Sequence, residues 1–193
     1  MSGRAVVVRA GDGAEVGSAV HEYADAVIDI WLPGATTDLP PDWALQNPAD
    51  WVAVLTTAVP AAIAASGVDA AQIVAIATDF TACTVLPVDT SGTPLCQIPE
   101  LSARPHAWPK LWKHHAAQPQ ADRINSLAHE RRQPWIDRYG GKISAEWQFA
   151  KALQVLEEDS EIYAATARIR LRPYRSWLPV MNQTLLPTNG DCI

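Results

Sequence analysis

The chain has 193 residues, 48% of them apolar, and a formal net charge of −6, which is typical of one soluble globular domain. This acidic balance argues against a protein that binds nucleic acid or an anionic membrane through its charge. No apolar run approaches the roughly 20 residues that span a bilayer, so we expect no membrane partner. Cys83, Cys96 and Cys192 form no Cys-x-x-Cys pair, which predicts free thiols and a cytoplasmic location.

A hairpin is predicted at the start of the chain. The β-branched run Ala5–Arg9 is typical of a strand, and Gly11-Asp12-Gly13 is a turn signal. The turn predicts that Glu15–Tyr23 returns as the second strand. Four residues that break regular structure, three prolines and a glycine, make 29–42 a loop.

An alanine-rich helix is predicted after this loop. Asn47 provides an N-cap and Pro48 suits the first helical position. We expect the helix to end at Ser66, because Gly67 is a typical C-terminal stop. Pro60 should bend the helix or mark a break in it.

The remaining chain mixes strand and helix patterns. Gln72–Ala77 is almost entirely apolar, which is typical of a strand buried on both faces. The order of the elements predicts an α/β fold with a mixed sheet. A further strand is expected at Val85–Val88, and helices at Lys110–Ala117, at Gln120–Arg131 after Pro119, and from Ser144 to Glu157.

The composition changes near the C-terminal end. From Arg168 onward the chain has four arginines and a single acid, and three prolines interrupt any regular pattern. We therefore expect residues 1–168 to form the domain. Residues 169–193 are expected to be a divergent tail, irregular or disordered.

Aromatic rings, cations and histidines are concentrated in Arg104–Ala117. Aromatic faces beside hydrogen-bond donors suit a small polyol. The three histidines of this stretch could instead bind a metal, but no carboxylate or cysteine lies at ligand spacing, so surface or pocket histidines are favoured. Trp108 and Trp112 can share a helix face; either both pack in the core, or Trp112 stacks on a ligand.

Three other positions carry weaker signals. Asp79 ends the expected buried strand, where it either faces a ligand or caps the local turn. Gly140-Gly141-Lys142 lacks the frame of a phosphate-binding loop, so a tight turn is favoured. Cys83 has no Cys–His signature, and a small residue under a pocket is favoured over a nucleophile. From the residues alone, an enzyme acting on small polar metabolites and a binding or assembly module both remain open.

Three longer segments are Ile76–Asp89, Leu111–Gln118 and Tyr139–Trp147, and they occur in this order. Together they resemble the ribulokinases, which belong to the FGGY carbohydrate kinases, and the resemblance runs from about Ser2 to Arg168. It implies the N-terminal, sugar-binding domain of an actin-like, ribonuclease-H-like fold. It also implies phosphorylation of L-ribulose in arabinose catabolism, with ATP and Mg²⁺ as cofactors. In such a reaction the main catalytic effect is to position the sugar alcohol in line with the γ-phosphate.

The resemblance also points to individual residues. Ala82 is a small residue where the sugar approaches, and Trp112 and Lys113 are further substrate contacts. Glu146 and Trp147 are expected to support the pocket wall. No catalytic, cofactor-binding or metal-binding residue of the family is matched.

The departures from the family shape the expected function. The family has a strand and a phosphate-binding turn before the segment that is Ser2–Ala5 here, and its catalytic aspartate and ATP-binding domain match nothing in this sequence. We therefore expect a domain incomplete at both ends and an inactive part of a ribulokinase, with L-ribulose or a related pentulose as partner. The alternatives are a non-catalytic sugar-binding or interaction module, or part of another FGGY pentulose or polyol kinase.

Overall fold

The computed structural model describes residues 1–79 and 82–170. Its first part is an antiparallel hairpin of β1 (Ser2–Val8) and β2 (Glu15–Glu22). The turn between them closes when Gly13 N donates to Arg9 O at 2.9 Å, and Gly13 has a φ of 75°, which glycine adopts without strain. The predicted hairpin is therefore confirmed.

A broken helix covers one face of this hairpin. It consists of α1 (Pro48–Ala53), a π-helical turn (Val54–Ala58) and α2 (Val59–Ser66). Asn47 caps α1 by accepting from Ala49 N at 2.9 Å, and Gly67 ends α2 with a φ of 68°. Because Pro60 lies in the first turn of α2, the break predicted near it is confirmed and falls at the π-helical turn.

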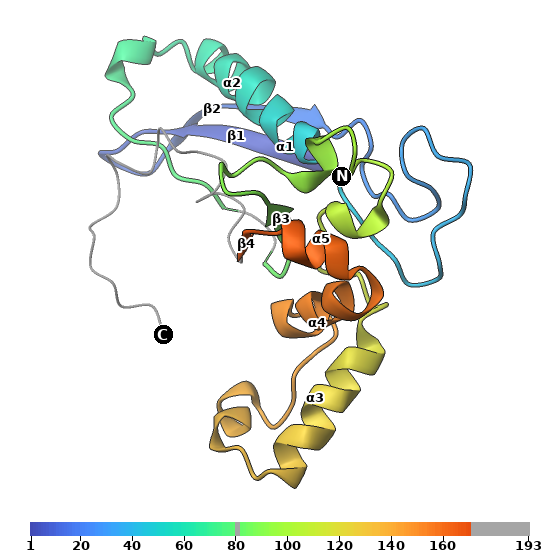
Figure 1. The fold of residues 1–193 in the computed structure, drawn as a ribbon. Coiled ribbons are helices and arrows are strands. Elements are labelled where there is room, and N and C mark those ends of the chain that lie inside the picture. The colour runs from blue at the N-terminus through green and yellow to red at the C-terminus, as the bar shows by residue number, and fades with distance from the viewer. Residues whose placement is uncertain (80–81, 171–193) are drawn as a thin grey trace.

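The helix and the hairpin touch backbone to backbone. A Cβ added at Gly17 would lie 2.6 Å from Ser66 N and 2.7 Å from Ala62 O, so only glycine fits there. Figure 1 shows α1 and α2 on the same side of β1 and β2. On the strands, Val6, Val8 and Val20 stay exposed.

The helical run Pro48–Ser66, 19 residues long, is apolar enough to cross a bilayer by length and composition. By length and composition, this run does not fit the expectation that the chain has no segment apolar enough to span a bilayer. A single such helix is weak evidence for a membrane, and Ala58 and Ala62 are buried where the run meets the hairpin. Asp50 is also buried and accepts hydrogen bonds from the amides of Ala24 and Asp25. These contacts are those of a helix that covers a sheet.

The second part of the molecule surrounds an aliphatic and aromatic core. Strand β3 (Leu86–Val88) pairs with β4 (Arg168–Arg170) in an antiparallel register. Both sheets of the described residues have two antiparallel strands, so the α/β class is confirmed but the mixed sheet is not. The largest buried apolar residues of this core are Ile28, Leu32, Leu39, Trp43, Leu45, Leu95, Trp108, Val155 and Ile162.

Three helices complete the second part, and in Figure 1 they descend from the core toward one end of the molecule. They are α3 (Gln118–Glu130), α4 (Gln148–Glu158) and α5 (Ser160–Ala165). Pro119 does not precede α3 as expected but lies in its first turn, where a missing N–H costs nothing. Ser144 caps no helix; its Oγ accepts from Glu146 N at 3.2 Å in the turn before α4.

The strand predicted at Gln72–Ala77 is wrong. The stretch 73–79 belongs to no strand, and Val74 retains 82% of its surface. An apolar run forms a buried strand only where neighbouring strands supply hydrogen bonds on both sides. No segment of the described chain pairs with it.

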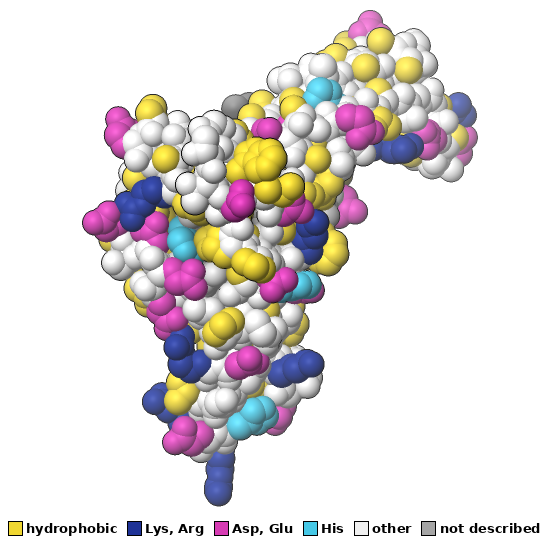
Figure 2. All heavy atoms as spheres, turned by 90° about the vertical axis from the view of Figure 1, so that its right-hand side faces the viewer, with side chains coloured by type: hydrophobic (Ala, Val, Ile, Leu, Met, Phe, Trp, Pro, Cys, Tyr) yellow, Lys and Arg dark blue, Asp and Glu magenta, His cyan; other side chains and the backbone are white. Residues whose placement is uncertain are grey.

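The expected domain boundary falls inside an element, because Arg168–Arg170 form β4. The rest of the expected tail, 171–193 with Cys192, lies outside the described residues. Figure 2 shows an elongated outline on which charges of both signs are mixed. On this face no single-sign patch of the kind that nucleic acid binds is visible.

Candidate functional site

The candidate site is organised by one antiparallel bridge between two loops. Val85 N donates to Lys110 O at 3.0 Å, and Lys110 N donates to Val85 O at 2.9 Å. In an antiparallel pair, residues that precede one partner lie beside residues that follow the other. The bridge therefore brings 82–84 and 111–113 to the same end.

The three predicted substrate contacts lie at this end and reach solvent. Ala82 is exposed, and Trp112 retains 40% of its surface. Lys113 is half-buried, with its Nζ 3.7 Å from Asp29 Oδ2, an ion pair that contributes little to stability. An indole face, an ammonium group and a small residue together can stack on a sugar and bond its hydroxyls.

The helix predicted at Lys110–Ala117 is wrong. These residues form successive turns, because Lys110 bonds with Val85 and Leu111 N donates to Ala44 O at 2.9 Å. Without the helix, the two tryptophans do not share a face. Trp108 is buried in the core, whereas Trp112 lies at the surface, so only Trp112 is available to a ligand.

A buried polar network lies beneath this surface, and the sequence analysis missed it. His114 is buried, and its Nδ1 accepts from Ala44 N at 3.2 Å. Its Nε2 therefore carries the proton and donates to Gln154 Oε1 at 2.9 Å. Burial, with the nearby Lys110 cation second, lowers the pKa of His114 to about 3. The neutral ring thus holds α4 against the loop that precedes Leu45.

Two buried lysines flank His114. Lys151 on α4 donates from Nζ to Cys83 O and to Leu111 O, both at 2.7 Å. Lys110 Nζ lies 3.5 Å from His106 O and 5.5 Å from the centre of the Trp43 ring. Burial is the main cause that lowers the pKa of Lys110 to about 7 and that of Lys151 to about 8.

His106, a second histidine of the predicted cluster, is also buried. Its Nε2 lies 3.3 Å from Glu158 Oε2, but its Nδ1 has no hydrogen-bond partner among the described residues. Burial, followed by the Lys110 and Arg104 cations, lowers its pKa to about 3. The expectation of surface or pocket histidines therefore holds only for His115.

His115 and Glu146 connect the site to the loop before α4. His115 Nε2 lies 3.1 Å from Glu146 Oε1. Trp147 is half-buried, and the centre of its ring lies 5.4 Å from that of Tyr139. The first contact places Glu146 beside the turns that follow Trp112, whereas Trp147 packs against Tyr139. The role of both residues in a pocket wall stays a prediction.

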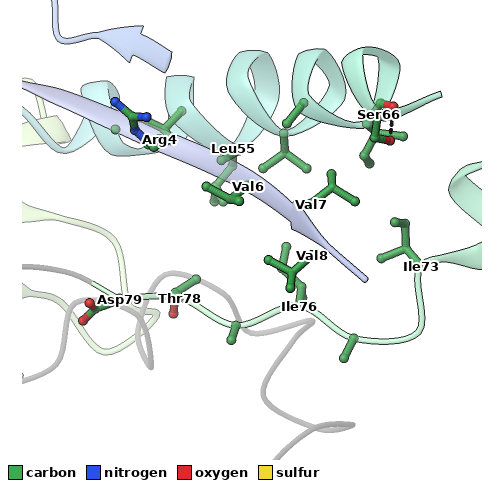
Figure 3. A pocket seen from close by; sticks show the side chains of 18 of the residues that line it. Arg4, Val6, Val7, Val8, Leu55, Ser66, Ile73, Ile76, Thr78 and Asp79 are labelled. Carbon is green, nitrogen blue, oxygen red and sulfur yellow. Dashed lines mark hydrogen bonds between the residues drawn. The ribbon is translucent and has the colours of Figure 1, made fainter. Parts of the chain in front are cut away.

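A groove of about 1270 Å³ lies elsewhere, between β1 and the extended stretch 72–79. Figure 3 shows its valine and isoleucine side chains, with Val8 and Ile76 near one another and Asp79 and Thr78 at one end. The lining is mainly apolar, and it includes none of the three predicted substrate contacts. Thr84 of the loop at 82–84 also lines the groove, so the groove borders the candidate site, and Asp79 belongs to the groove.

The turn at Gly140–Gly141 does not provide a phosphate site. Both residues have positive φ, Gly140 N donates to Asp137 O at 3.1 Å and Gly141 N donates to Ile136 O at 3.0 Å. Because both amides are used within the turn, neither can bind a phosphate. The prediction of a tight turn is confirmed. Within 1–79 and 82–170, no group of three or more His, Cys, Asp or Glu side chains is placed to hold a metal ion.

The chain was compared with known proteins, and no family model matches it. Over 169 residues it is 59% identical to a ribulokinase of Mycolicibacterium smegmatis, an alignment that covers 87% of this chain and 30% of that protein. The chain is homologous to part of the ribulokinases. A ribulokinase of Bacillus licheniformis is 52% identical, with 88% of this chain and 31% of that protein covered.

The solved structures agree with this homology at the level of the fold. A xylulose kinase of Brucella ovis matches with a TM-score of 0.64 and 19% identity, over 88% of this chain and 29% of that one. The fold is thus that of a portion of a sugar kinase. The chain spans about 30% of the length of the ribulokinases that it matches.

Proposed function

We propose that this chain provides the sugar-binding part of a ribulokinase, with L-ribulose as the sugar. The observation that carries the proposal is the bridge between Val85 and Lys110, next to which lie the exposed Ala82 and Trp112 and the half-buried Lys113. The 52% to 59% identity with two ribulokinases supports this sugar over other pentuloses. Residues 1–168 then correspond to the N-terminal, actin-like domain of the kinase.

Each of the three residues has a defined task in this proposal. The Trp112 indole stacks on the apolar face of the sugar, and the Lys113 ammonium donates to its hydroxyls. Ala82 has no side chain beyond Cβ, so the sugar can approach the backbone there. Together these contacts bind and orient the alcohol that is phosphorylated.

The described residues do not fit the remaining part of the reaction. Both glycine amides of the turn at Gly140–Gly141 are used within it, and no cluster of metal ligands is present among 1–79 and 82–170. ATP and Mg²⁺ supply the phosphoryl group and neutralise its charge in a kinase of this kind. We assign these tasks to parts of a ribulokinase that the 193 residues do not match, and we expect no phosphoryl transfer from this chain alone. The ribulokinase homology and the free thiols together support a cytoplasmic protein.

Calorimetric titration tests the proposal directly. The purified chain is titrated with L-ribulose and then with D-xylulose, and ADP formation is followed separately with ATP, Mg²⁺ and L-ribulose. We expect saturable binding of L-ribulose, weaker binding of D-xylulose and no ADP. A folded chain that releases no heat with L-ribulose would contradict sugar binding, and sugar-dependent ADP formation would contradict the assignment of catalysis to other parts.

A further inference from the structure

Lys151 is buried without any exposed surface. Its Nζ donates to Cys83 O and to Leu111 O, each at 2.7 Å. Desolvation of an ammonium group is costly unless hydrogen bonds replace the lost water. The two carbonyls provide that replacement, and both belong to the loops that carry the candidate site.

These two carbonyls lie where the backbone bridge ends. Continued beyond Val85 and Lys110, the antiparallel register would place Cys83 opposite Trp112. Cys83 instead has a φ of 66°, a left-handed conformation that turns the chain away and is rare for residues other than glycine. Lys151 Nζ thus joins the two segments where their backbone pairing stops, by donating to the carbonyl of Cys83 and to that of Leu111.

The carbonyls are also direct neighbours of the predicted substrate contacts. Ala82 precedes Cys83 in the chain, and the Leu111 carbonyl belongs to the peptide bond that leads into Trp112. We propose that Lys151 is a positioning residue that fixes Ala82 and Trp112 relative to one another for the sugar. This inference rests on the proposed function, because it assumes that these two residues contact L-ribulose.

Lys110 offers a matched control. It is the other buried lysine of this core, and it has nearly the same exposure. Its Nζ approaches His106 O and the Trp43 ring rather than the loop at 82–84. A lysine that only stabilises the core should therefore behave like Lys110 when it is substituted.

The test compares Lys151→Met with Lys110→Met in the full chain. L-Ribulose affinity is measured by calorimetry, and the position of Trp112 by fluorine NMR of the chain labelled with 5-fluorotryptophan, with Trp112→Phe used to assign the resonance. We expect Lys151→Met to weaken binding about tenfold or more and to shift the Trp112 resonance. Lys110→Met removes only side-chain contacts and keeps the backbone bridge to Val85, so it should keep the affinity within about twofold and leave that resonance in place.

Several outcomes would overturn the proposal. One is equal affinities and an unmoved Trp112 resonance in Lys151→Met. If Lys151→Met does not fold, Lys151→Gln, which keeps a hydrogen-bond donor, is compared with Lys110→Gln. Unfolding of both Lys151 variants would show a purely structural role for Lys151 and would overturn the proposal. If the unsubstituted chain binds no L-ribulose, the proposed function fails, and the Trp112 resonance alone decides whether Lys151 positions the loops.

Discussion

The two parts of the molecule are built in opposite ways. The hairpin of β1 and β2 is covered on one face by α1 and α2, and Val6, Val8 and Val20 stay exposed among the described residues. The part around Leu45 and Trp108 buries both apolar side chains and a polar network of His114, Lys151 and Gln154. Among the described residues, the first part has an unpaired strand edge and exposed apolar surface, whereas the second satisfies most of its buried polar groups internally.

This difference indicates where the candidate site gets its geometry. The loops at 82–84 and 111–113 are fixed by contacts of the second part, namely the bridge between Val85 and Lys110 and the two hydrogen bonds of Lys151. The hairpin contributes none of the three predicted substrate contacts. We therefore expect substitutions in the second part to disturb sugar binding, and substitutions in the hairpin to act mainly on stability and self-association.

The largest effect is expected for Leu45→Ala, which creates a cavity in the second part. Leu45 is fully buried, and its backbone bonds with Ile28. The free energy of unfolding should fall by about 2–5 kcal/mol. Val6→Ala at an exposed position of β1 is the control, with an expected change below about 0.5 kcal/mol. Urea denaturation followed by circular dichroism measures both, and equal effects would contradict the contrast between the two parts.

Gly17→Ala should destabilise the hairpin side by about 1–3 kcal/mol. The added Cβ would meet the backbone of Ala62 and Ser66, and a helix backbone cannot move away as a side chain can. Gly11→Ala provides the control, because nothing lies within 4 Å of a Cβ there. Melting temperatures of the two variants decide the matter, and an unchanged value for Gly17→Ala would show that α2 does not lie on β2.

Acid should destabilise the second part. The pKa of His106 and that of His114 are lowered to about 3 from an ordinary value of 6.5, so the unfolded chain binds more protons between these two values. The free energy of unfolding therefore falls as pH drops below 6.5, by up to about 1.4 kcal/mol per pH unit for each histidine. Urea denaturation at several pH values measures this slope.

The variant His106→Phe identifies the source of the slope. It removes one of the two titrating rings, together with a buried Nδ1 that has no partner among the described residues. Below pH 6.5, we expect the free energy of unfolding to change with pH about half as steeply as in the unsubstituted chain. Little stability should be lost at pH 7. A slope that His106→Phe leaves unchanged would mean that other groups cause the acid sensitivity.

The smallest effect on stability is expected for Val6→Lys. Val6 is exposed on β1, whose edge pairs with no other strand of the described chain. A lysine on an edge strand opposes association with other strands, so self-association should decrease while stability changes by less than about 0.5 kcal/mol. Sedimentation velocity at increasing concentration compares the variant with the unsubstituted chain. Equal self-association of Val6→Lys and the unsubstituted chain would show that the edge of β1 does not drive association.

Local signals in the sequence predicted the fold well. Asn47, Pro48 and Gly67 act at the ends of the helix as expected, because capping depends on the residues next to it in the chain. The turn at Gly13 and the strand after Val85 were predicted for the same reason. Each of these features is decided within a few residues.

Features that depend on distant partners were not predicted. The run after Gln72 has strand composition but pairs with no strand of the described chain. The bridge to Val85 prevents the helix that was expected at Lys110–Ala117. The buried lysine of α4 was missed too, because its carbonyl acceptors come from loops far along the chain. One signal was available: Lys151 lies on the same helix face as Gln154 and Val155, which are also buried.

The central claim is that Trp112 contacts L-ribulose, and one calorimetric comparison tests it most directly. Trp112→Ala is titrated beside Trp135→Ala, because these tryptophans retain 40% and 36% of their surface and both substitutions remove an exposed indole. We predict that Trp112→Ala weakens L-ribulose binding about tenfold or more, equivalent to about 1.4 kcal/mol, while Trp135→Ala binds like the unsubstituted chain. Equal affinities of the two variants and the unsubstituted chain would contradict the account.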